Sequence, residues 1–189
     1  MVDLENDINN AVRTLEEGGV LLYPTDTIWG LGCDALNAEA VERVFGIKQR
    51  PREKSLIVLL SDADDLRKYT GSLPPRLTEI LEEFRRPVTV IYEDARGLPP
   101  NVIHPDGSIA IRITRDPFCR ALITRSGKPL ISTSANISGV PAPASFSEIS
   151  PGIIHACDYV VRHRRQEKTA ATPSSIIRIG NDGQIITIR

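Results

Sequence analysis

The chain of 189 residues has little of what marks a metal-binding, disulfide-bonded or secreted protein. Its three cysteines, Cys33, Cys119 and Cys157, are odd in number and far apart, which argues against a disulfide framework. The three histidines show no metal-ligand spacing and no C-x-x-C pair occurs, so we expect no metal site. No apolar stretch approaches the roughly 20 residues that span a bilayer. The start, MVDLENDINN, lacks the basic residues and apolar run of a signal peptide, so we expect a cytoplasmic protein without membrane partners.

Neither sign of charge predominates, and aromatic residues are few. The chain has 23 Lys and Arg against 24 Asp and Glu, a net charge of −1, and 5% aromatic residues. Dedicated RNA binders are typically basic and use aromatic rings for stacking, so this composition counts against a dedicated RNA-binding protein. The near-neutral net charge is nevertheless compatible with a local basic patch. A hydrophobic fraction of 41% suffices for a sizeable core, and we expect a single domain over residues 1–189.

Helical periodicities and short apolar runs alternate along the chain, which predicts an α/β fold. The Asn-Asp-Gly sequence at 181–183 predicts a hairpin, so the sheet should be mixed, with flanking helices. Residues 24–35, 99–105 and 141–151 are interpreted as loops because they are rich in glycine or proline. The expected helices are 3–17, 38–47, 62–69, 75–84 and 116–125, and the expected strands are 20–23, 56–60, 88–92, 108–113, 129–133, 158–161, 174–179 and 184–189.

A cluster of cations follows the second expected helix: Lys48, Arg50, Arg52 and Lys54. Such a run is usually a solvated face. However, Pro51 stiffens this segment, and loops at strand ends are where α/β sheets bind ligands. Fixed cations on such a loop are also suited to a polyphosphate.

Two polar turns leave the ends of apolar strands. The turn at 132–139 holds serines and an asparagine, and it reads either as a plain turn or as an anion-binding nest. The turn at 24–27 precedes Trp29, Gly30 and Gly32. It reads either as a capped turn with a packed tryptophan or as a small polar pocket for a substrate hydroxyl or carboxylate.

Arg112 lies within the expected strand 108–113. Alternation places it on the face of Ala110, opposite the isoleucines of that strand. It is therefore either a surface arginine or a pocket arginine that binds a carboxylate through two hydrogen bonds.

Four segments in order, PTDTIWGLG, KQRPREKSL, STSANISG and PSSII, resemble the signatures of the YrdC family, and the resemblance covers about residues 10–189. Members of that family include bacterial threonylcarbamoyl-AMP synthases. The resemblance implies a twisted α/β sheet with a large concave basic surface. It also implies a reaction of L-threonine, bicarbonate and ATP that releases pyrophosphate. One departure from the family pattern is Arg85-Arg86-Pro87, where members often have Pro-Gly-Pro.

The resemblance also implies roles for individual residues. Lys48 and Arg50 would be catalytic and, with Lys54, would clamp the triphosphate. The other implied contacts are Thr27, Arg112, Ser132 and Ser175 to threonine, and Ser108, Ser134, Asn136 and Arg189 to ATP.

The resemblance implies ATP as a substrate. Mg²⁺ would be bound to the ATP phosphates, with few ligands from the protein. The implied partners are the proteins that transfer the threonylcarbamoyl group to tRNA. The competing hypothesis is a non-catalytic protein that binds double-stranded RNA or tRNA by its backbone on the same concave surface.

Overall fold

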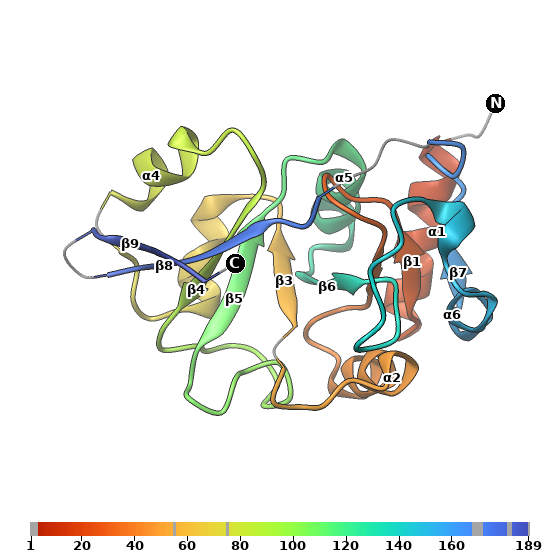
Figure 1. The fold of residues 1–189 in the computed structure, drawn as a ribbon, viewed down its shortest axis with the longest axis horizontal. Coiled ribbons are helices and arrows are strands. Elements are labelled where there is room, and N and C mark those ends of the chain that lie inside the picture. Colours follow the sequence, from red (N-terminus) through yellow and green to blue (C-terminus); the bar gives the residue numbers. More distant parts are fainter. Residues whose placement is uncertain (1–3, 55, 75, 168–171, 181–182, 189) are drawn as a thin grey trace.

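A single mixed sheet runs through the molecule, with helices on both of its faces (Figure 1). The computed structural model describes residues 4–54, 56–74, 76–167, 172–180 and 183–188. The strands are β1 (Leu21–Tyr23), β2 (Gly30–Gly32), β3 (Ile57–Leu60), β4 (Val88–Tyr92), β5 (Ile109–Ile113), β6 (Leu130–Ser134), β7 (Tyr159–Val160), β8 (Ser175–Ile179) and β9 (Ile185–Thr187). The helices are α1 (Leu4–Glu16), α2 (Ala38–Lys48), α3 (Leu66–Tyr69), α4 (Leu77–Glu83), α5 (Pro117–Ser126) and α6 (Pro151–Ala156), with 3₁₀ turns η1 (Ala63–Asp65) and η2 (Phe146–Glu148).

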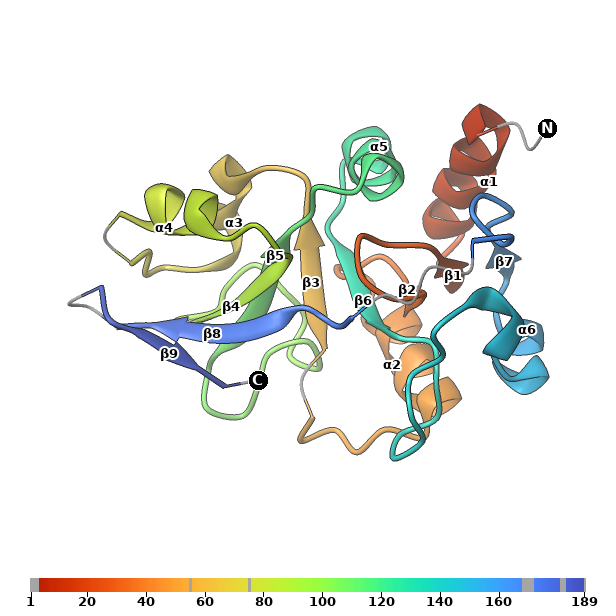
Figure 2. The same cartoon turned by 45° about the horizontal axis from the view of Figure 1, so that its top comes forward.

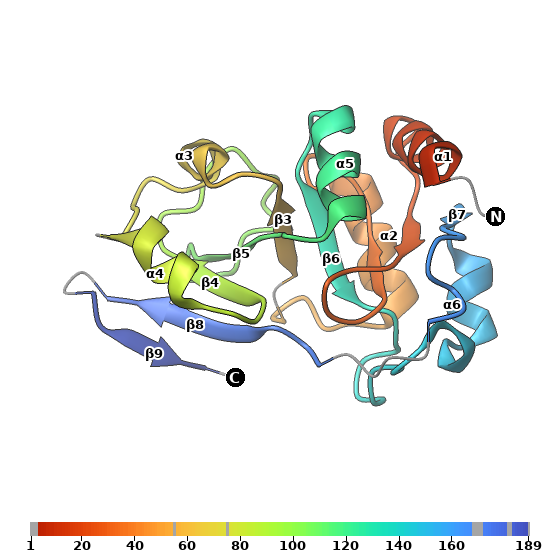
Figure 3. The ribbon, with the colours of Figure 1, turned by 90° about the horizontal axis from the view of Figure 1, so that it is seen from above.

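The order of strands in the sheet is β7-β1-β2-β6-β3-β5-β4-β8-β9. The pairs β1–β7, β3–β5 and β4–β8 are parallel, and the other neighbours are antiparallel. The mixed sheet predicted from the sequence is therefore confirmed. Its C-terminal strands β8 and β9 lie at the end remote from α1 (Figure 3).

Polar side chains begin the helices where the sequence indicates. The Asn37 side chain accepts hydrogen bonds from the backbone N–H groups of Glu39 and Ala40, both at 3.1 Å, and so caps α2. Asp116 accepts from the N–H of Cys119 at 3.0 Å and caps α5, whose first residue is Pro117. Both predicted helix starts are confirmed.

Strand alternation divides the core between the two faces of the sheet. On β3 and β6, Leu59 and Leu130 pack with α1 and α5, whereas Val58 and Ile131 pack on the other face with α2. Figure 2 shows α5 and α2 on opposite sides of β6. The face of Leu59 continues past these helices onto β5, β4 and β8, where it carries the cavity described below.

Two elements were not predicted from the sequence: one lies in a predicted loop, and the other begins at the end of one. Strand β2 occupies part of the segment 24–35. It was not predicted because two of its three residues are glycines, which have a low strand propensity. Gly32 is required there, because a Cβ atom at this position would lie 1.7 Å from the Ile131 carbonyl oxygen of β6. Helix α6 begins at Pro151, the last residue of a proline-rich segment. The predicted hairpin joins β8 and β9, which pair antiparallel, although residues 181–182 of its turn are outside the described residues.

The described helices include none with the length and apolar character needed to cross a membrane. All three thiols are free, and Cys33 and Cys119 are buried. Burial raises the pKa of both thiols, so neither is a reactive nucleophile.

Candidate functional site

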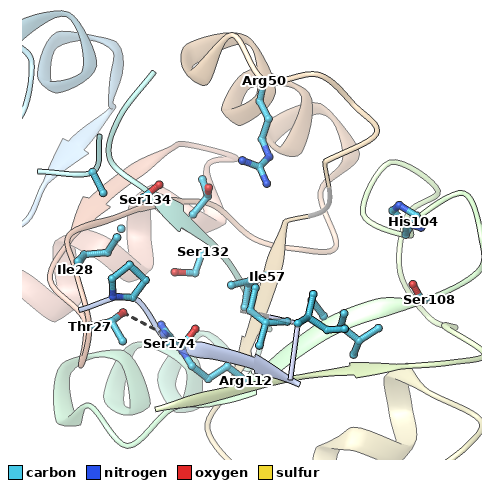
Figure 4. A pocket seen from close by; sticks show the side chains of 18 of the residues that line it. Thr27, Ile28, Arg50, Ile57, His104, Ser108, Arg112, Ser132, Ser134 and Ser174 are labelled. Atoms are coloured by element: carbon cyan, nitrogen blue, oxygen red, sulfur yellow. Dashed lines mark hydrogen bonds between the residues drawn. The ribbon is translucent and has the colours of Figure 1, made fainter. Parts of the chain in front are cut away.

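A cavity of about 420 Å³ opens on the same sheet face as α1 and α5, over the part of that face that these two helices leave uncovered. Its floor includes Ile57, Ala110 and Arg112, which project from the adjacent strands β3 and β5. The loop after β1, the end of β6 and the start of β8 form its walls. Figure 4 shows these segments, which are distant in the sequence, around one space.

Arg112 is a buried cation at one end of this cavity, with 3% of its surface exposed. Its Nη1 donates to Thr27 Oγ1 at 3.0 Å, and its Nη2 lies 3.5 Å from Asp26 Oδ1. Its Nε is buried without a hydrogen-bond partner among the described residues. Because a buried N–H group without a partner is unfavourable, this guanidinium is suited to a ligand carboxylate. Of the two interpretations of Arg112, the structure supports the pocket arginine.

The hydroxyl of Thr27 is fixed by a short chain of hydrogen bonds. Thr25 Oγ1 donates to the Ile28 carbonyl oxygen at 2.8 Å and lies 2.9 Å from Thr27 Oγ1. Since the one hydroxyl proton of Thr25 goes to Ile28, Thr27 must donate to Thr25 while it accepts from Arg112. The turn at 24–27 thus forms a polar pocket wall, the second of its two interpretations.

Besides Ser108, three serines line the same cavity: Ser132 and Ser134 of β6, and Ser174, which directly precedes β8. Ser132 and Ser134 lie on the same face because they are two residues apart on one strand. Ser174 Oγ lies 2.9 Å from Thr89 Oγ1 of β4, and this buried contact fixes its position. The cavity therefore offers several hydroxyl groups beside one buried guanidinium.

Ser175, to which the resemblance assigns a threonine contact, is exposed and does not line the cavity. Alternation along β8 explains this placement. Ile177 and Ile179 belong to the core of the opposite face, and Ser175 lies in phase with them. Ser174 and Ile176 lie in the other phase and line the cavity, so the serine suited to this contact is Ser174.

Arg50 extends into the cavity from the loop after α2 (Figure 4). Its Nε donates to the Lys54 carbonyl oxygen at 2.9 Å, which orients the guanidinium. The side chain of Lys54 is exposed and does not line the cavity. The structure thus brings Arg50, and not the Lys54 side chain, to the other groups that line the cavity.

Lys48 is almost fully buried, and its ammonium group faces protein oxygens instead of the cavity. Its Nζ donates to the carbonyl oxygens of Ser134 at 2.5 Å and Asn136 at 2.7 Å. Burial, and then the nearby charge of Arg50, lower the pKa of Lys48 to about 8. Lys48 therefore stabilises the end of β6, where Ser134 lies, and the turn that follows it.

Asn136 stabilises the same turn. Its side-chain amide donates to the carbonyl oxygens of Ile137 at 3.2 Å and Val140 at 2.5 Å, and it does not line the cavity. Of the residues implied to bind ATP, Ser108 and Ser134 line the cavity together with Arg50. Arg189 is outside the described residues.

The sequence interpretation missed His104, Asp106 and Arg178, which also line the cavity. Arg178 lies in phase with Ile176 on β8, so strand alternation could have indicated it. His104 lies in the segment 99–105, which was interpreted only as a proline-rich loop, and Asp106 directly follows that segment.

The described residues contain no group of three or more His, Cys, Asp and Glu side chains that could hold a metal ion. Asp106 is the one carboxylate among the described lining residues, and it pairs with His104. Mg²⁺ keeps several waters and binds substrate phosphates readily, so these residues fit an ion that arrives with a nucleotide.

Comparisons with known proteins identify the family of this chain. The family model Sua5_yciO_yrdC, described as "Telomere recombination", matches residues 13–189. A threonylcarbamoyl-AMP synthase of Xanthomonas euvesicatoria pv. vesicatoria is 37% identical over 183 residues, which cover 95% of this chain and 96% of that protein. Another, from Xanthomonas campestris pv. campestris, is 36% identical over 185 residues, covering 95% and 96%.

Solved structures share the fold. P. abyssi Sua5 in complex with L-threonine superposes with a TM-score of 0.86 and 24% identity, over 100% of this chain and 55% of that one. E. coli YciO gives a TM-score of 0.84 with 23% identity, over 99% and 89%. The match to the family model and to relatives of nearly equal length places this chain in the Sua5/YciO/YrdC family.

Proposed function

We propose that this protein is an L-threonylcarbamoyladenylate synthase. L-threonine and bicarbonate condense to a carbamate with loss of water. A carbamate oxygen then attacks the α-phosphorus of ATP, and pyrophosphate leaves. The observation that carries the proposal is the buried guanidinium of Arg112, whose Nε has no partner within the described ranges and which lies beside Thr27. The proposal is also supported by the sequence identity of 37% to a protein named threonylcarbamoyl-AMP synthase.

The threonine end of the cavity is assigned from its hydrogen-bonding groups. Arg112 is suited to the substrate carboxylate, because a guanidinium binds a carboxylate through parallel hydrogen bonds. The Thr27 hydroxyl, whose proton is directed to Thr25, presents an oxygen that accepts from the substrate amine or hydroxyl. Ser132 and Ser174 supply further hydroxyl groups to the same ligand.

The transfer step requires positioning and charge neutralisation more than covalent help from the protein. Arg50 is placed to neutralise the departing pyrophosphate, and Mg²⁺ bound to the phosphates would share that charge. Lys48 is a positioning residue in this proposal, since its Nζ holds the Ser134 and Asn136 carbonyl oxygens. Lys54 then contributes only its backbone carbonyl oxygen, which accepts from Arg50 Nε and orients that guanidinium.

The product would be consumed by proteins that transfer the threonylcarbamoyl group to tRNA. Direct binding of tRNA or double-stranded RNA to the concave surface stays a prediction of the resemblance.

Pyrophosphate release from ATP tests the proposal. Release should require both L-threonine and bicarbonate, and it should fall when serine or glycine replaces threonine. The same assay on Arg112→Lys should show a rise in the threonine KM, while Arg120→Lys, an exposed change on α5, should behave as wild type. Release that is independent of threonine and bicarbonate would contradict the proposed reaction.

A further inference from the structure

His104 and Asp106 form a side-chain pair on the cavity wall to which neither the sequence motifs nor the relatives' names assign a role. Nδ1 of His104 lies 2.8 Å from Asp106 Oδ1. The same carboxylate oxygen accepts from the backbone N–H of Ser108 at 2.9 Å. The backbone joins the same residues, because the His104 N–H donates to the Ser108 carbonyl oxygen at 2.9 Å. The imidazole is therefore held on a turn closed by several hydrogen bonds.

The pairing fixes which ring nitrogen of His104 carries the proton. Hydrogen bonds from the Ser108 side chain and backbone, and from His104, hold the pKa of Asp106 well below its usual range. An ionised carboxylate only accepts hydrogen bonds, so the 2.8 Å contact assigns the proton to Nδ1 of His104. The backbone N–H of Asp106 also faces Nδ1, but it lies farther away, at 3.4 Å. In the neutral imidazole, Nε2 then has a lone pair and acts as an acceptor.

The pair lies at the end of the cavity remote from Arg112. Ser108, Ala110 and Arg112 follow one another at alternate positions of one extended segment and all line the cavity. At about 3.3 Å per residue, Ser108 and Arg112 are separated by about 13 Å. Figure 4 shows His104 and Ser108 on one side and Thr27 and Ser174 on the other. A ligand contacted by His104 is therefore distinct from the group held by Arg112.

The floor between these ends is apolar. Ile57 of β3, Ala110 of β5 and Ile91 of β4 lie in register across three neighbouring strands, and all line the cavity. Ile176 of β8 adds to the same surface. A flat apolar row with a hydrogen-bonding group at its edge is suited to a planar heterocycle. This end of the cavity therefore fits the base of a nucleotide better than its phosphates.

We propose that Nε2 of His104 accepts a hydrogen bond from the exocyclic amine of adenine, which makes His104 a specificity-determining residue for the nucleotide. Adenine presents an N–H₂ donor at this position, whereas guanine presents a carbonyl acceptor, which would meet the lone pair of Nε2. Asp106 acts through His104 by holding the tautomer. This inference rests on the proposed function, because it assumes that the cavity binds ATP.

Equilibrium binding separates the inference from the reaction itself. The probes are a non-hydrolysable ATP analogue and the matching purine riboside analogue, which lacks the 6-amino group. Wild type should bind the ATP analogue about 3- to 10-fold more tightly, as one hydrogen bond contributes. In His104→Ala that preference should disappear, through loss of affinity for the ATP analogue alone. His155→Ala, an exposed histidine outside the cavity, should keep the preference.

The purine riboside analogue is also an internal control for folding, because it cannot form the bond in question. Its affinity should be equal in wild type and His104→Ala. Asp106→Ala should lose part of the preference for the ATP analogue, because the proton of His104 is then no longer held on Nδ1. A preference that persists in His104→Ala would overturn the role of His104 and leave the proposed function standing. Failure of wild type to bind either analogue would overturn both.

Discussion

Arg112 Nη1 donates to Thr27 Oγ1 at 3.0 Å, and this bond joins strand β5 to the loop after β1. The two residues are 85 positions apart in the sequence. Their contact brings the only buried guanidinium among the described cavity-lining residues to a hydroxyl whose own proton is directed elsewhere. The pair therefore presents a donor and an acceptor side by side, as an amino-acid ligand requires.

The first prediction concerns this pair. Arg112→Lys retains a positive charge but removes the planar fork, so it should raise the threonine KM by about 10- to 100-fold, the range expected for a charged hydrogen bond. The ATP KM should change less than threefold, because Arg112 lies at the threonine end. Steady-state kinetics with each substrate varied would measure both. Equal rises in the two KM values would contradict the assignment.

Neighbouring serines provide the second prediction. Ser174→Ala removes a hydroxyl that lines the cavity, and the threonine KM should rise about 3- to 10-fold. Ser175→Ala removes an exposed hydroxyl from the opposite face of the strand and should change the KM less than twofold. A larger rise in the threonine KM for Ser175→Ala than for Ser174→Ala would instead support the threonine contact that the family resemblance assigns to Ser175.

The two lysines of the cationic loop should differ. Lys48→Met removes the donor to the Asn136 carbonyl oxygen and one of the two donors to the Ser134 carbonyl oxygen, which should lower the free energy of unfolding by about 1–3 kcal/mol and reduce kcat. Lys54→Met, at an exposed side chain, should leave stability unchanged within about 0.5 kcal/mol. Urea denaturation of both variants measures this difference. Equal stabilities would show that the Lys48 contacts contribute nothing.

The lowered pKa of Lys48 predicts a pH dependence. Below pH about 8 the folded protein carries the ammonium form, and above it Lys48 loses a proton and one hydrogen-bond donor. The rate at saturating threonine should therefore fall as the pH rises through about 8. The free energy of unfolding should instead rise with pH between about 8 and 10.5, the usual pKa of a lysine. In this range the unfolded chain still binds the proton that the folded protein has lost, so unfolding becomes less favourable.

A control distinguishes Lys48 from other titrating groups. Lys48→Arg keeps the charge at high pH, so the fall in rate near pH 8 should be absent from this variant. A pH profile with the same fall in both proteins would assign it to another group.

Alanine substitutions at two glycines should change the stability of the protein in opposite directions. Gly32→Ala places a Cβ atom 1.7 Å from the Ile131 carbonyl oxygen, so β2 and β6 must separate and stability should fall by more than about 3 kcal/mol. Gly46→Ala, in α2, meets nothing within 4 Å and should stabilise the protein by about 0.5–1 kcal/mol. Thermal unfolding of the two variants would measure both effects. A stable Gly32→Ala protein would contradict the strand pairing at this position.

The sequence predicts the elements well where periodicity and end signals agree. Helix α2, with its Asn37 cap, and strand β5, with Arg112 opposite the isoleucines, are examples. Strand β2 escapes prediction because it is formed by tertiary pairing around two glycines, not by local propensity.

At the site, residue types were easier to predict than their orientations. The motif containing Lys48 and Arg50 places both near one loop, but only the structure shows that Lys48 faces backbone carbonyl oxygens while Arg50 faces the cavity. The choice between Ser174 and Ser175 depends on strand phase, which a two-serine sequence does not reveal. His104 and Asp106 carry no sequence signal, because their pairing is made by a turn in a segment without periodicity.

The most direct test is to incubate the protein with ATP, L-threonine and ¹³C-labelled bicarbonate and to identify the products by mass spectrometry. The account predicts an adenylate that contains AMP, threonine and one labelled carbon, together with pyrophosphate, and a much smaller yield from Arg112→Lys. An adenylate without the labelled carbon, or ADP and phosphate as the only products, would contradict it.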